Sequence, residues 1–220
     1  PYLLNLASPK DETYEVSVRA LAHEITRCQS LGADYLVFHP GNHLGSGMEA
    51  GIKRIAAAIK KACDMTELTR DNGLTLLLEM VSGAGTEVGW MFEHQRDIMG
   101  MAEGAPLGIC LDTCHMFAAG HDIATREGLS ETLEKVDEIL GISYVSVAHC
   151  NDSVGVLGSR LDRHADIGSG MIGEEGFRVI LGNSKIRALP LILETPKIRM
   201  ENDKRNLAAI RRLAKEAVIW

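Results

Sequence analysis

The feature that most restricts the fold is a short apolar run that recurs five times and ends each time on a His, Glu or Asp. Each run has the length expected for a strand that is covered on both faces of a sheet. The runs are "DYLVFHPG", "LTLLLEM", "LGICLDTCH", "YVSVAHCND" and "PLILETP", and their polar end residues are His39, Glu79, Asp112, His149 and Glu194. These ends lie roughly 33 to 45 residues apart, which leaves room for a strand, a loop and a returning helix.

The stretches between the apolar runs have the composition of helices. Residues 12–31 place apolar side chains at helical spacing, and Gly32 is a suitable stop. Residues 48–70 are rich in Ala, Lys and Ile, and residues 126–140 and 200–218 resemble them. Strands that alternate with helices indicate a parallel sheet.

The convergence of five polar strand ends favours a closed barrel over an open sheet, because only a closed barrel brings all strand ends to one point. A (β/α)₈ barrel needs at least about 200 residues, and this chain of 220 residues shows five clear strands. We therefore expect an α/β TIM barrel whose first strands, about three of the eight, lie upstream of Pro1. No linker or low-complexity tract interrupts residues 1–220, so we expect a single barrel catalytic domain.

The five strand-end residues form a mixed nitrogen and oxygen ligand set. His and carboxylate ligands suit Zn²⁺, and Mn²⁺ or Fe²⁺ are compatible with them. Five ligands are too many for one zinc ion but suit two ions that share a carboxylate. Glu79 lies between its neighbours in strand order and is the expected bridge.

A second group of potential ligands lies beside the first. His115 follows Asp112 by three residues in "LDTCH", and Asp162 and His164 lie in a loop, "LDRHADIG", after the fourth strand. We expect His115, Asp162 and His164 to hold a third ion. The alternative for the Asp-x-His pair is a salt-bridged histidine in an ordinary loop.

Composition and charge limit the class of protein. The net charge of −7 argues against non-specific coating of nucleic acid, but bound divalent ions would reverse the sign locally. No apolar run approaches the ~18 residues of a membrane span, and no signal-peptide pattern opens the chain. We expect an intracellular protein, cytoplasmic in a bacterium and nuclear or mitochondrial in a eukaryote. The five cysteines show no disulfide spacing. Those near the ligand edge are expected to pack rather than to bind metal: Cys110, Cys114 and Cys150.

Motifs that run through nearly the whole chain carry a resemblance to a known family. They are "YLLNLASP", "FHPGNH", "LLLEMVSGAGTEVG", "GICLDTCHMFAAGHD", "HCNDSVGVLGSRLDRHADIGSGMIG" and "LILETP". In this order they resemble the endonuclease IV family of apurinic/apyrimidinic (AP) endonucleases. The combination of "LDTCH" with "GSRLDRH" and "GSGMIG" is highly specific, whereas "AGTEVGW" is a loose match.

The resemblance implies a barrel that binds three zinc ions and hydrolyses the phosphodiester bond 5′ to an abasic site in DNA. The product would carry a 3′-hydroxyl, and trimming of blocked 3′ ends would accompany this activity. One further histidine of the family's first metal site would fall upstream of Pro1. Matched by motif, Glu79 would bridge the first two metals, and His39 would join it on the first. The second metal would also be held by Asp112, His149 and Glu194. The third would be held by His115, Asp162 and His164. Glu79 and Glu194 would be catalytic, with Glu194 orienting or deprotonating the attacking water.

The resemblance also implies contacts with DNA. Tyr2 and Leu3 match a segment that inserts into DNA at the lesion, and Arg160 and Arg163 would lie near phosphates. The alternatives are ordinary loop and core residues for the first pair and solvent-exposed charge for the second. The expected partner is double-stranded DNA with abasic sites or blocked 3′ ends, bound by a monomer without a membrane.

Two other functions compete with the endonuclease. A metal-dependent sugar isomerase or epimerase on a xylose-isomerase-like barrel would explain the strand-end ligands with one or two ions. It would leave His115, Asp162 and His164 without a role. A non-catalytic DNA-lesion binder is a second alternative, but buried carboxylates without a metal would be costly for it.

Overall fold

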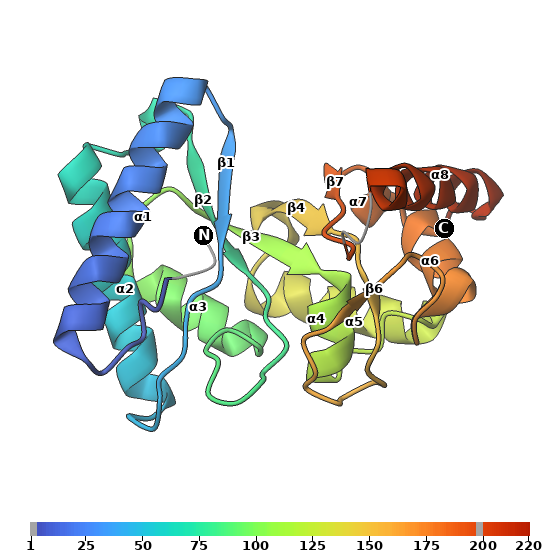
Figure 1. Cartoon of the computed structure of the whole chain (residues 1–220), viewed down its shortest axis with the longest axis horizontal. Coiled ribbons are helices and arrows are strands. Elements are labelled where there is room, and N and C mark those ends of the chain that lie inside the picture. Colours follow the sequence, from blue (N-terminus) through green and yellow to red (C-terminus); the bar gives the residue numbers. More distant parts are fainter. Residues whose placement is uncertain (1–3, 197–199) are drawn as a thin grey trace. The chain divides into compact units, whose positions relative to one another are not determined.

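The computed structural model of the chain describes residues 4–196 and 200–220. The described residues form two compact units, whose elements are labelled in Figure 1. The first unit contains residues 4–80 and Gly85–Ile109, and the second contains Val81–Ala84 and the described residues from Cys110 onward. The expectation that residues 1–220 form a single barrel domain stays a prediction.

The first unit is a parallel sheet covered by helices (Figure 1). Its elements are α1 (Asp11–Leu31), β1 (Tyr35–Phe38), α2 (Met48–Thr66), the 3₁₀ helix η1 (Arg70–Asn72), β2 (Thr75–Glu79), α3 (Phe92–Met101) and the first half of β3 (Leu107–Asp112). Strands β1 and β2 pair in parallel from Tyr35 opposite Thr75 to Phe38 opposite Leu78. Helix α2 packs against both α1 and α3. The fully buried side chains of Leu21, Ile55 and Ile59 form part of the core of this unit.

The second unit continues the alternation of strands and helices. Its elements are the second half of β3, α4 (Thr113–Ala119), α5 (Arg126–Ile139), the 3₁₀ helix η2 (Ile142–Tyr144), β4 (Val145–His149), β5 (Asp152–Ser153), β6 (His164–Ala165), α6 (Gly173–Gly182), α7 (Ser184–Arg187), β7 (Leu191–Ile192) and α8 (Met200–Glu216). The strands follow the order β3-β4-β7, and β4 pairs with β7 in parallel, with His149 opposite Ile192. Strands β5 and β6 form a separate antiparallel pair.

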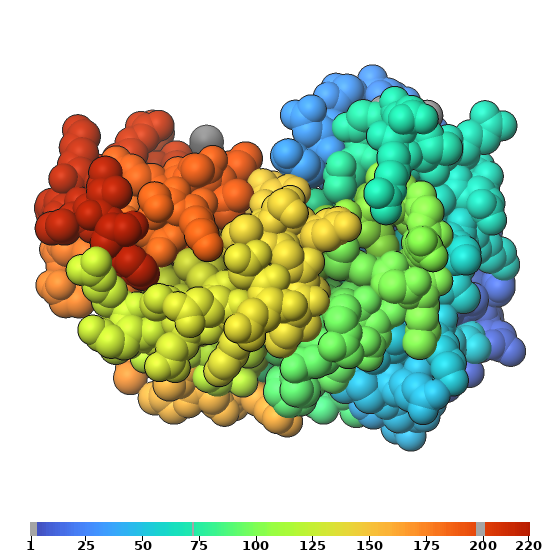
Figure 2. All heavy atoms as spheres, turned by 180° about the vertical axis from the view of Figure 1, so that it is seen from behind, coloured from blue at the N-terminus to red at the C-terminus, as the bar shows by residue number. Residues whose placement is uncertain are grey.

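Helices α6 and α8 pack together at the end of the second unit. Figure 2 shows the C-terminal residues in red beside the orange segment that contains α6. Phe177 of α6 is fully buried, and a network of exposed ion pairs joins the two helices. Arg178 on α6 pairs with Glu174 and Glu216, and Arg212 on α8 pairs with the same two carboxylates.

The structure confirms the five predicted strands and the four predicted helices. Gly32 ends α1 in the left-handed conformation, with φ of 65°, and its N–H bonds to the main chain of that helix. Helix α2 ends at Thr66 rather than at residue 70, because Glu67 adopts a left-handed φ of 52°. No helix among the described residues is both long enough and apolar enough to cross a membrane.

Candidate metal centre

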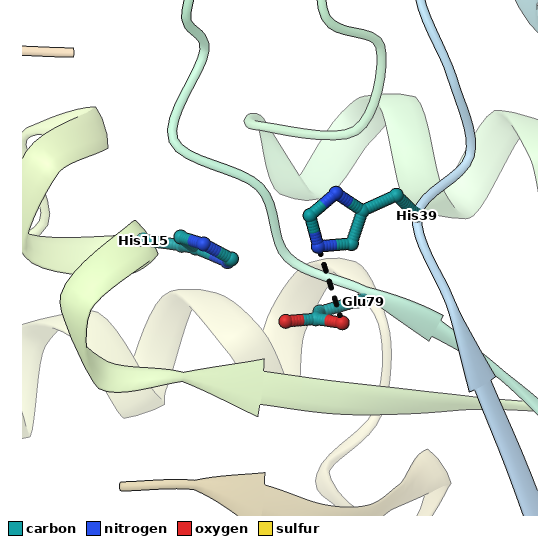
Figure 3. Close-up of side chains that lie close together, drawn as sticks. All are labelled: His39, Glu79 and His115. Carbon is teal, nitrogen blue, oxygen red and sulfur yellow. Dashed lines mark ion pairs between the residues drawn. The ribbon is translucent and has the colours of Figure 1, made fainter. Parts of the chain in front are cut away.

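The carboxyl ends of β1 and β2 bring His39 and Glu79 together in the first unit. The parallel register places Phe38 opposite Leu78, so the next residue of each strand reaches the same edge. The His39 Nε2 atom lies 3.4 Å from the Glu79 Oε2 atom, and Figure 3 shows the two side chains facing each other. The Glu79 main-chain oxygen accepts a hydrogen bond from Gln95 Nε2 at 2.9 Å, which fixes the end of β2. We call His39 and Glu79 the first ligand pair.

The second unit gathers Asp112, His149 and Glu194, which we call the second ligand set. Asp112 and His149 are the last residues of β3 and β4, and Glu194 follows β7. The His149 Nδ1 atom lies 3.1 Å from Glu194 Oε2 and 3.8 Å from Asp112 Oδ2. Asp112 is fully buried, whereas the Glu194 side chain is 46% exposed. The second ligand set therefore combines one nitrogen and two carboxylates, one of which reaches solvent.

His115, Asp162 and His164 form a tight cluster in the same unit, and we call them the third ligand set. The His115 Nε2 atom lies 3.1 Å from Asp162 Oδ1 and 3.4 Å from His164 Nε2. The His164 Nε2 atom lies 3.7 Å from Asp162 Oδ1. Three potential donor atoms thus lie close together, and their role as metal ligands stays a prediction. His115, which is also drawn in Figure 3, is buried, and Asp162 is partly open to solvent.

Local structure explains how these residues meet. Asp112 ends β3 and caps α4, because its Oδ1 atom accepts a hydrogen bond from the His115 main-chain N–H at 2.8 Å. This cap places His115 in the first turn of α4. The antiparallel pairing of Ser153 with His164 holds the other side of the third ligand set. The main-chain N–H of Val154 extends this pairing by donating to the Arg163 carbonyl at 2.9 Å.

A hydrogen bond to the main chain fixes the orientation of His164. Its Nδ1 atom lies 2.9 Å from the main-chain oxygen of Glu194. Because a carbonyl oxygen only accepts hydrogen bonds, Nδ1 carries the proton in the neutral ring, and Nε2 keeps its lone pair. That lone pair faces His115 and Asp162, which is the arrangement typical of metal-ligating histidines.

The spacing of the donor atoms fits zinc. Tetrahedral zinc with bonds of about 2.0–2.1 Å places neighbouring ligand atoms about 3.3 Å apart. The donor atoms of the third ligand set are separated by 3.1 to 3.7 Å, and His149 and Glu194 by 3.1 Å. Two imidazoles and one carboxylate in the third ligand set also match the nitrogen and oxygen preference of zinc. The third ligand set and the pair of His149 and Glu194 therefore have a spacing that fits a divalent metal.

Burial raises the pKa of two cysteine thiols that lie near the candidate ligands. Burial raises the pKa of the Cys114 thiol to about 11, and the neighbouring Asp112 charge adds to this shift. Burial raises the pKa of Cys150 to about 12. The Cys114 Sγ atom is within 4.8 Å of ligand atoms of Asp112 and His164, but it donates a hydrogen bond to the Arg163 carbonyl at 3.6 Å. Both cysteines are buried, and the expectation that they pack rather than bind metal stays a prediction.

The residues expected to contact DNA are only partly described. Arg160 and Arg163 are exposed, in the loop that precedes β6. Arg160 has a left-handed φ of 53°, and its main-chain N–H donates to the Ala118 carbonyl at 2.9 Å. Tyr2 and Leu3 lie outside the described residues. The assignment of all four to DNA binding stays a prediction.

The sequence analysis missed Asn151, which lies two residues after His149 at the end of β4. Its side chain is fully buried and bonds to Asp112 and to the main chain of Glu194. The available signal was a polar residue next to a strand-end ligand in "HCND". That signal does not distinguish a buried amide from an exposed loop residue.

Comparison with known proteins places these features in a family. The model of the xylose isomerase-like TIM barrel family matches residues 1–216, which confirms the predicted fold class. A protein from Methanoculleus marisnigri named probable endonuclease 4 is 47% identical over 97% of this chain and 75% of its own length. A protein of the same name from Chloroflexus aurantiacus is 45% identical over 98% of this chain and 75% of its own length.

Solved structures agree with the sequence comparison. Endonuclease IV from Thermus thermophilus superposes with a TM-score of 0.84 at 37% identity, over 98% of this chain and 74% of that one. A D-tagatose 3-epimerase-like protein superposes with a TM-score of 0.75 at 21% identity, over 97% of this chain and 74% of that one, and shares the fold alone. The chain therefore belongs to the xylose isomerase-like TIM barrel family and, within it, to the endonuclease IV family of AP endonucleases.

Proposed function

We propose that this protein is a DNA repair enzyme that hydrolyses the phosphodiester bond 5′ to an abasic site and leaves a 3′-hydroxyl. Membership of the endonuclease IV family supports this proposal. We extend it to the trimming of blocked 3′ ends, since such ends present the same phosphodiester to the same donor groups. Genomic DNA as the substrate implies an intracellular protein.

The observation that carries the proposal is the third ligand set. A sugar isomerase or epimerase needs only the strand-end ligands, so it gives His115, Asp162 and His164 no role. The distances of 3.1 to 3.7 Å between their donor atoms, and the ring orientation fixed through Glu194, support their assignment as a ligand group. A salt-bridged histidine in an ordinary loop requires only one carboxylate partner. It does not account for the second imidazole, whose Nε2 atom lies 3.4 Å away.

We propose zinc as the metal, with three ions in the complete site and Mn²⁺ or Fe²⁺ as substitutes. His39 and Glu79 would contribute to the first ion, Glu79 would bridge to the second, and the third ligand set would hold the third. Zinc, when bound, supplies Lewis acidity and a source of hydroxide near neutral pH. The nitrogen and carboxylate composition of each set supports this assignment.

Glu194 is the proposed general base. Its carboxylate is half exposed, so a water at the site can reach it, while His149 holds its Oε2 atom at 3.1 Å. In this role Glu194 orients the attacking water toward the phosphorus and accepts a proton from it. Glu79 contributes differently, because it is almost fully buried and faces His39. We propose that Glu79 would hold metal and balance part of its positive charge.

Duplex DNA is the proposed partner. Arg160 and Arg163 are exposed, and in the sequence they lie close to Asp162 and His164 of the third ligand set. Exposed arginines at this place suit contacts with phosphates. We propose that Tyr2 and Leu3 contact the lesion. An abasic sugar has no base to unstack, so turning it out of the helix costs less than for an intact nucleotide. We propose action as a monomer, because a single chain contributes all the ligands named above.

The test is incision of a duplex that carries one tetrahydrofuran abasic analogue, with the protein at its natural length and loaded with Zn²⁺. The analogue cannot undergo β-elimination, so a lyase would not cut it. We expect cleavage 5′ to the analogue and a 3′-hydroxyl that a DNA polymerase extends. An undamaged duplex and a chelator-treated sample are the controls.

The other functions give different results in this assay. Binding of the damaged duplex without cleavage would identify a lesion binder. Neither binding nor cleavage by the zinc-loaded protein would refute the proposed function and favour the sugar isomerase or epimerase. That alternative also predicts one or two bound ions instead of three.

A further inference from the structure

The side-chain amide of Asn151 is bonded at both ends inside the second unit. Its Nδ2 atom donates to Asp112 Oδ2 at 2.6 Å, and its Oδ1 atom accepts from the Glu194 main-chain N–H at 2.7 Å. Asn151 is fully buried, so no water replaces either partner without a structural change. A single side chain thus joins two members of the second ligand set, which lie on different segments.

The chemistry of the partners requires an amide at this position. An ionised carboxylate only accepts hydrogen bonds, and a main-chain N–H only donates them, so one end of the Asn151 side chain must donate and the other must accept. The main chain of Asn151 is held equally firmly. Its N–H donates to Thr113 Oγ1 at 2.8 Å, and the Thr113 hydroxyl donates back to the Asn151 carbonyl at 2.7 Å. Asn151 is therefore fixed to the residue that follows Asp112.

The hydrogen bonds of Asn151 continue into the third ligand set. The main-chain N–H of Glu194 donates to Asn151 Oδ1, and the Glu194 carbonyl accepts a hydrogen bond from His164 Nδ1 at 2.9 Å. His164 faces His115 across 3.4 Å, and the His115 main-chain N–H donates to Asp112 Oδ1 at 2.8 Å. The contacts form a closed ring that runs through Asp112, Asn151, Glu194, His164 and His115.

We propose that Asn151 is a positioning residue that holds Asp112 and Glu194 at ligand spacing and couples the second ligand set to the third. The proposal rests on the proposed function in taking both sets as metal ligands. Both oxygens of Asp112 are oriented by the ring, one by Asn151 and one by His115. The backbone of Glu194 is oriented from both sides, by Asn151 and by His164. Loss of Asn151 therefore disturbs ligands of two metals, although Asn151 itself touches neither substrate nor metal.

Two substitutions separate positioning from packing. Asn151→Ala removes both hydrogen bonds. Asn151→Asp keeps almost the same volume and the acceptor, but it places a second carboxylate against Asp112 in place of a donor. Asn183→Ala is the matched control, because Asn183 is also a buried asparagine of the second unit and its Oδ1 atom caps α7 with hydrogen bonds from Lys185 and Ile186.

The measurement is Zn²⁺ affinity by competition with a chromophoric chelator, together with circular dichroism and the melting temperature. We expect zinc dissociation constants about 10- to 100-fold higher in both Asn151 variants, as is typical when a group that orients metal ligands is lost. More than one binding step should weaken, because the ring passes through two ligand sets. Asn183→Ala should lower the melting temperature and leave zinc affinity unchanged.

The result that would overturn the proposal is zinc binding equal to that of the wild type in the folded Asn151 variants, or failure of both variants to fold. Either outcome would make Asn151 a purely structural residue. The measurement uses zinc alone, so it is independent of DNA cleavage. A wild-type protein that binds zinc and does not incise abasic DNA would refute the proposed function and leave the role of Asn151 intact.

Discussion

The Nδ1 atom of His164 lies 2.9 Å from the main-chain oxygen of Glu194. This contact joins the histidine that opens β6 to the segment after β7 and turns the other ring nitrogen toward His115 and Asp162. A histidine in an unstructured loop would rotate freely, and ordering it on metal binding would cost entropy. The ring is instead oriented in advance by the fold, which is the arrangement expected of a site that binds its metal tightly.

Replacement of His115 tests the third ligand set through activity. His115→Ala removes a buried ligand atom that lies 3.1 Å from Asp162 and 3.4 Å from His164. We expect incision of the tetrahydrofuran duplex to slow by at least about 100-fold, because a Lewis acid contributes several kcal/mol to such a transition state. His23→Ala is the control, since its side chain is 73% exposed. Equal rates for the two variants would contradict the assignment of His115.

Replacement of Glu194 separates catalysis from metal binding. Glu194→Gln keeps an oxygen at the same place but cannot accept a proton from water near neutral pH. We expect the rate of incision to fall by about 10² to 10⁴, the usual contribution of a general base, with a smaller change in bound zinc. The rate and the zinc content are to be measured on the same preparation. A rate that falls only in proportion to the zinc lost would show that Glu194 is a ligand and not the base.

The loop after β6 depends on glycine at position 170. A Cβ atom added at Gly170 would overlap the Ser153 main-chain oxygen and Asp152 Oδ1. Asp152 in turn accepts hydrogen bonds from the main chain of Gly170 at 2.9 Å and of Ile172 at 3.0 Å. We expect Gly170→Ala to lower the free energy of unfolding by about 1–3 kcal/mol, the usual cost of overpacking.

A helical glycine is the control for Gly170. Gly100 lies in α3 with nothing within 4 Å of an added Cβ. Gly100→Ala should be neutral or raise the free energy of unfolding by up to about 1 kcal/mol, because Ala is the better helix former. Urea unfolding measures both variants. A Gly170→Ala variant as stable as the wild type would show that the loop shifts to accept the methyl group.

The pKa of Cys63 predicts a loss of stability at high pH. Burial in α2 raises the pKa of this thiol from 9.0 to about 11 in the folded protein. Above pH 9 the unfolded chain releases this proton while the folded chain keeps it, so the free energy of unfolding falls as pH rises toward about 11. Removing the thiol in Cys63→Ala should reduce this fall by about 2 kcal/mol.

Urea unfolding of the wild type and of Cys63→Ala at several pH values between about 8 and 11 measures this effect. Tyrosine and lysine side chains also titrate in this range, but they contribute equally to the two proteins. The difference between the two slopes therefore reports Cys63 alone. Parallel slopes would contradict the raised pKa.

The strands and the polar residues at their ends were predictable because the signal is local. A strand covered on both faces needs a continuous apolar run, and a polar residue at its end stands out against that run. This reasoning located His39, Glu79, Asp112 and His149 at or next to the ends of their strands. Glu194 follows a strand of only two residues, yet its apolar run was long enough to be recognised.

The elements that orient the ligands were not predictable in the same way. Helix α4 begins directly after β3 because the side chain of Asp112 caps it, and "LDTCH" gives no periodic signal of its own. Strands β5 and β6 have two residues each, which is too short to leave a periodic pattern in the sequence. Asn151 is recognisable as a positioning residue only once Asp112 and Glu194 are known to lie on either side of it.

The most direct test of the third ligand set counts zinc. Wild-type protein and Asp162→Ala, at natural length and loaded with Zn²⁺ under the same conditions, are to be dialysed and measured by elemental analysis. We predict one zinc ion fewer per chain in Asp162→Ala, because its carboxylate completes the group with His115 and His164. The same zinc content in both proteins would contradict the third metal, and with it the feature that separates this site from that of a sugar isomerase.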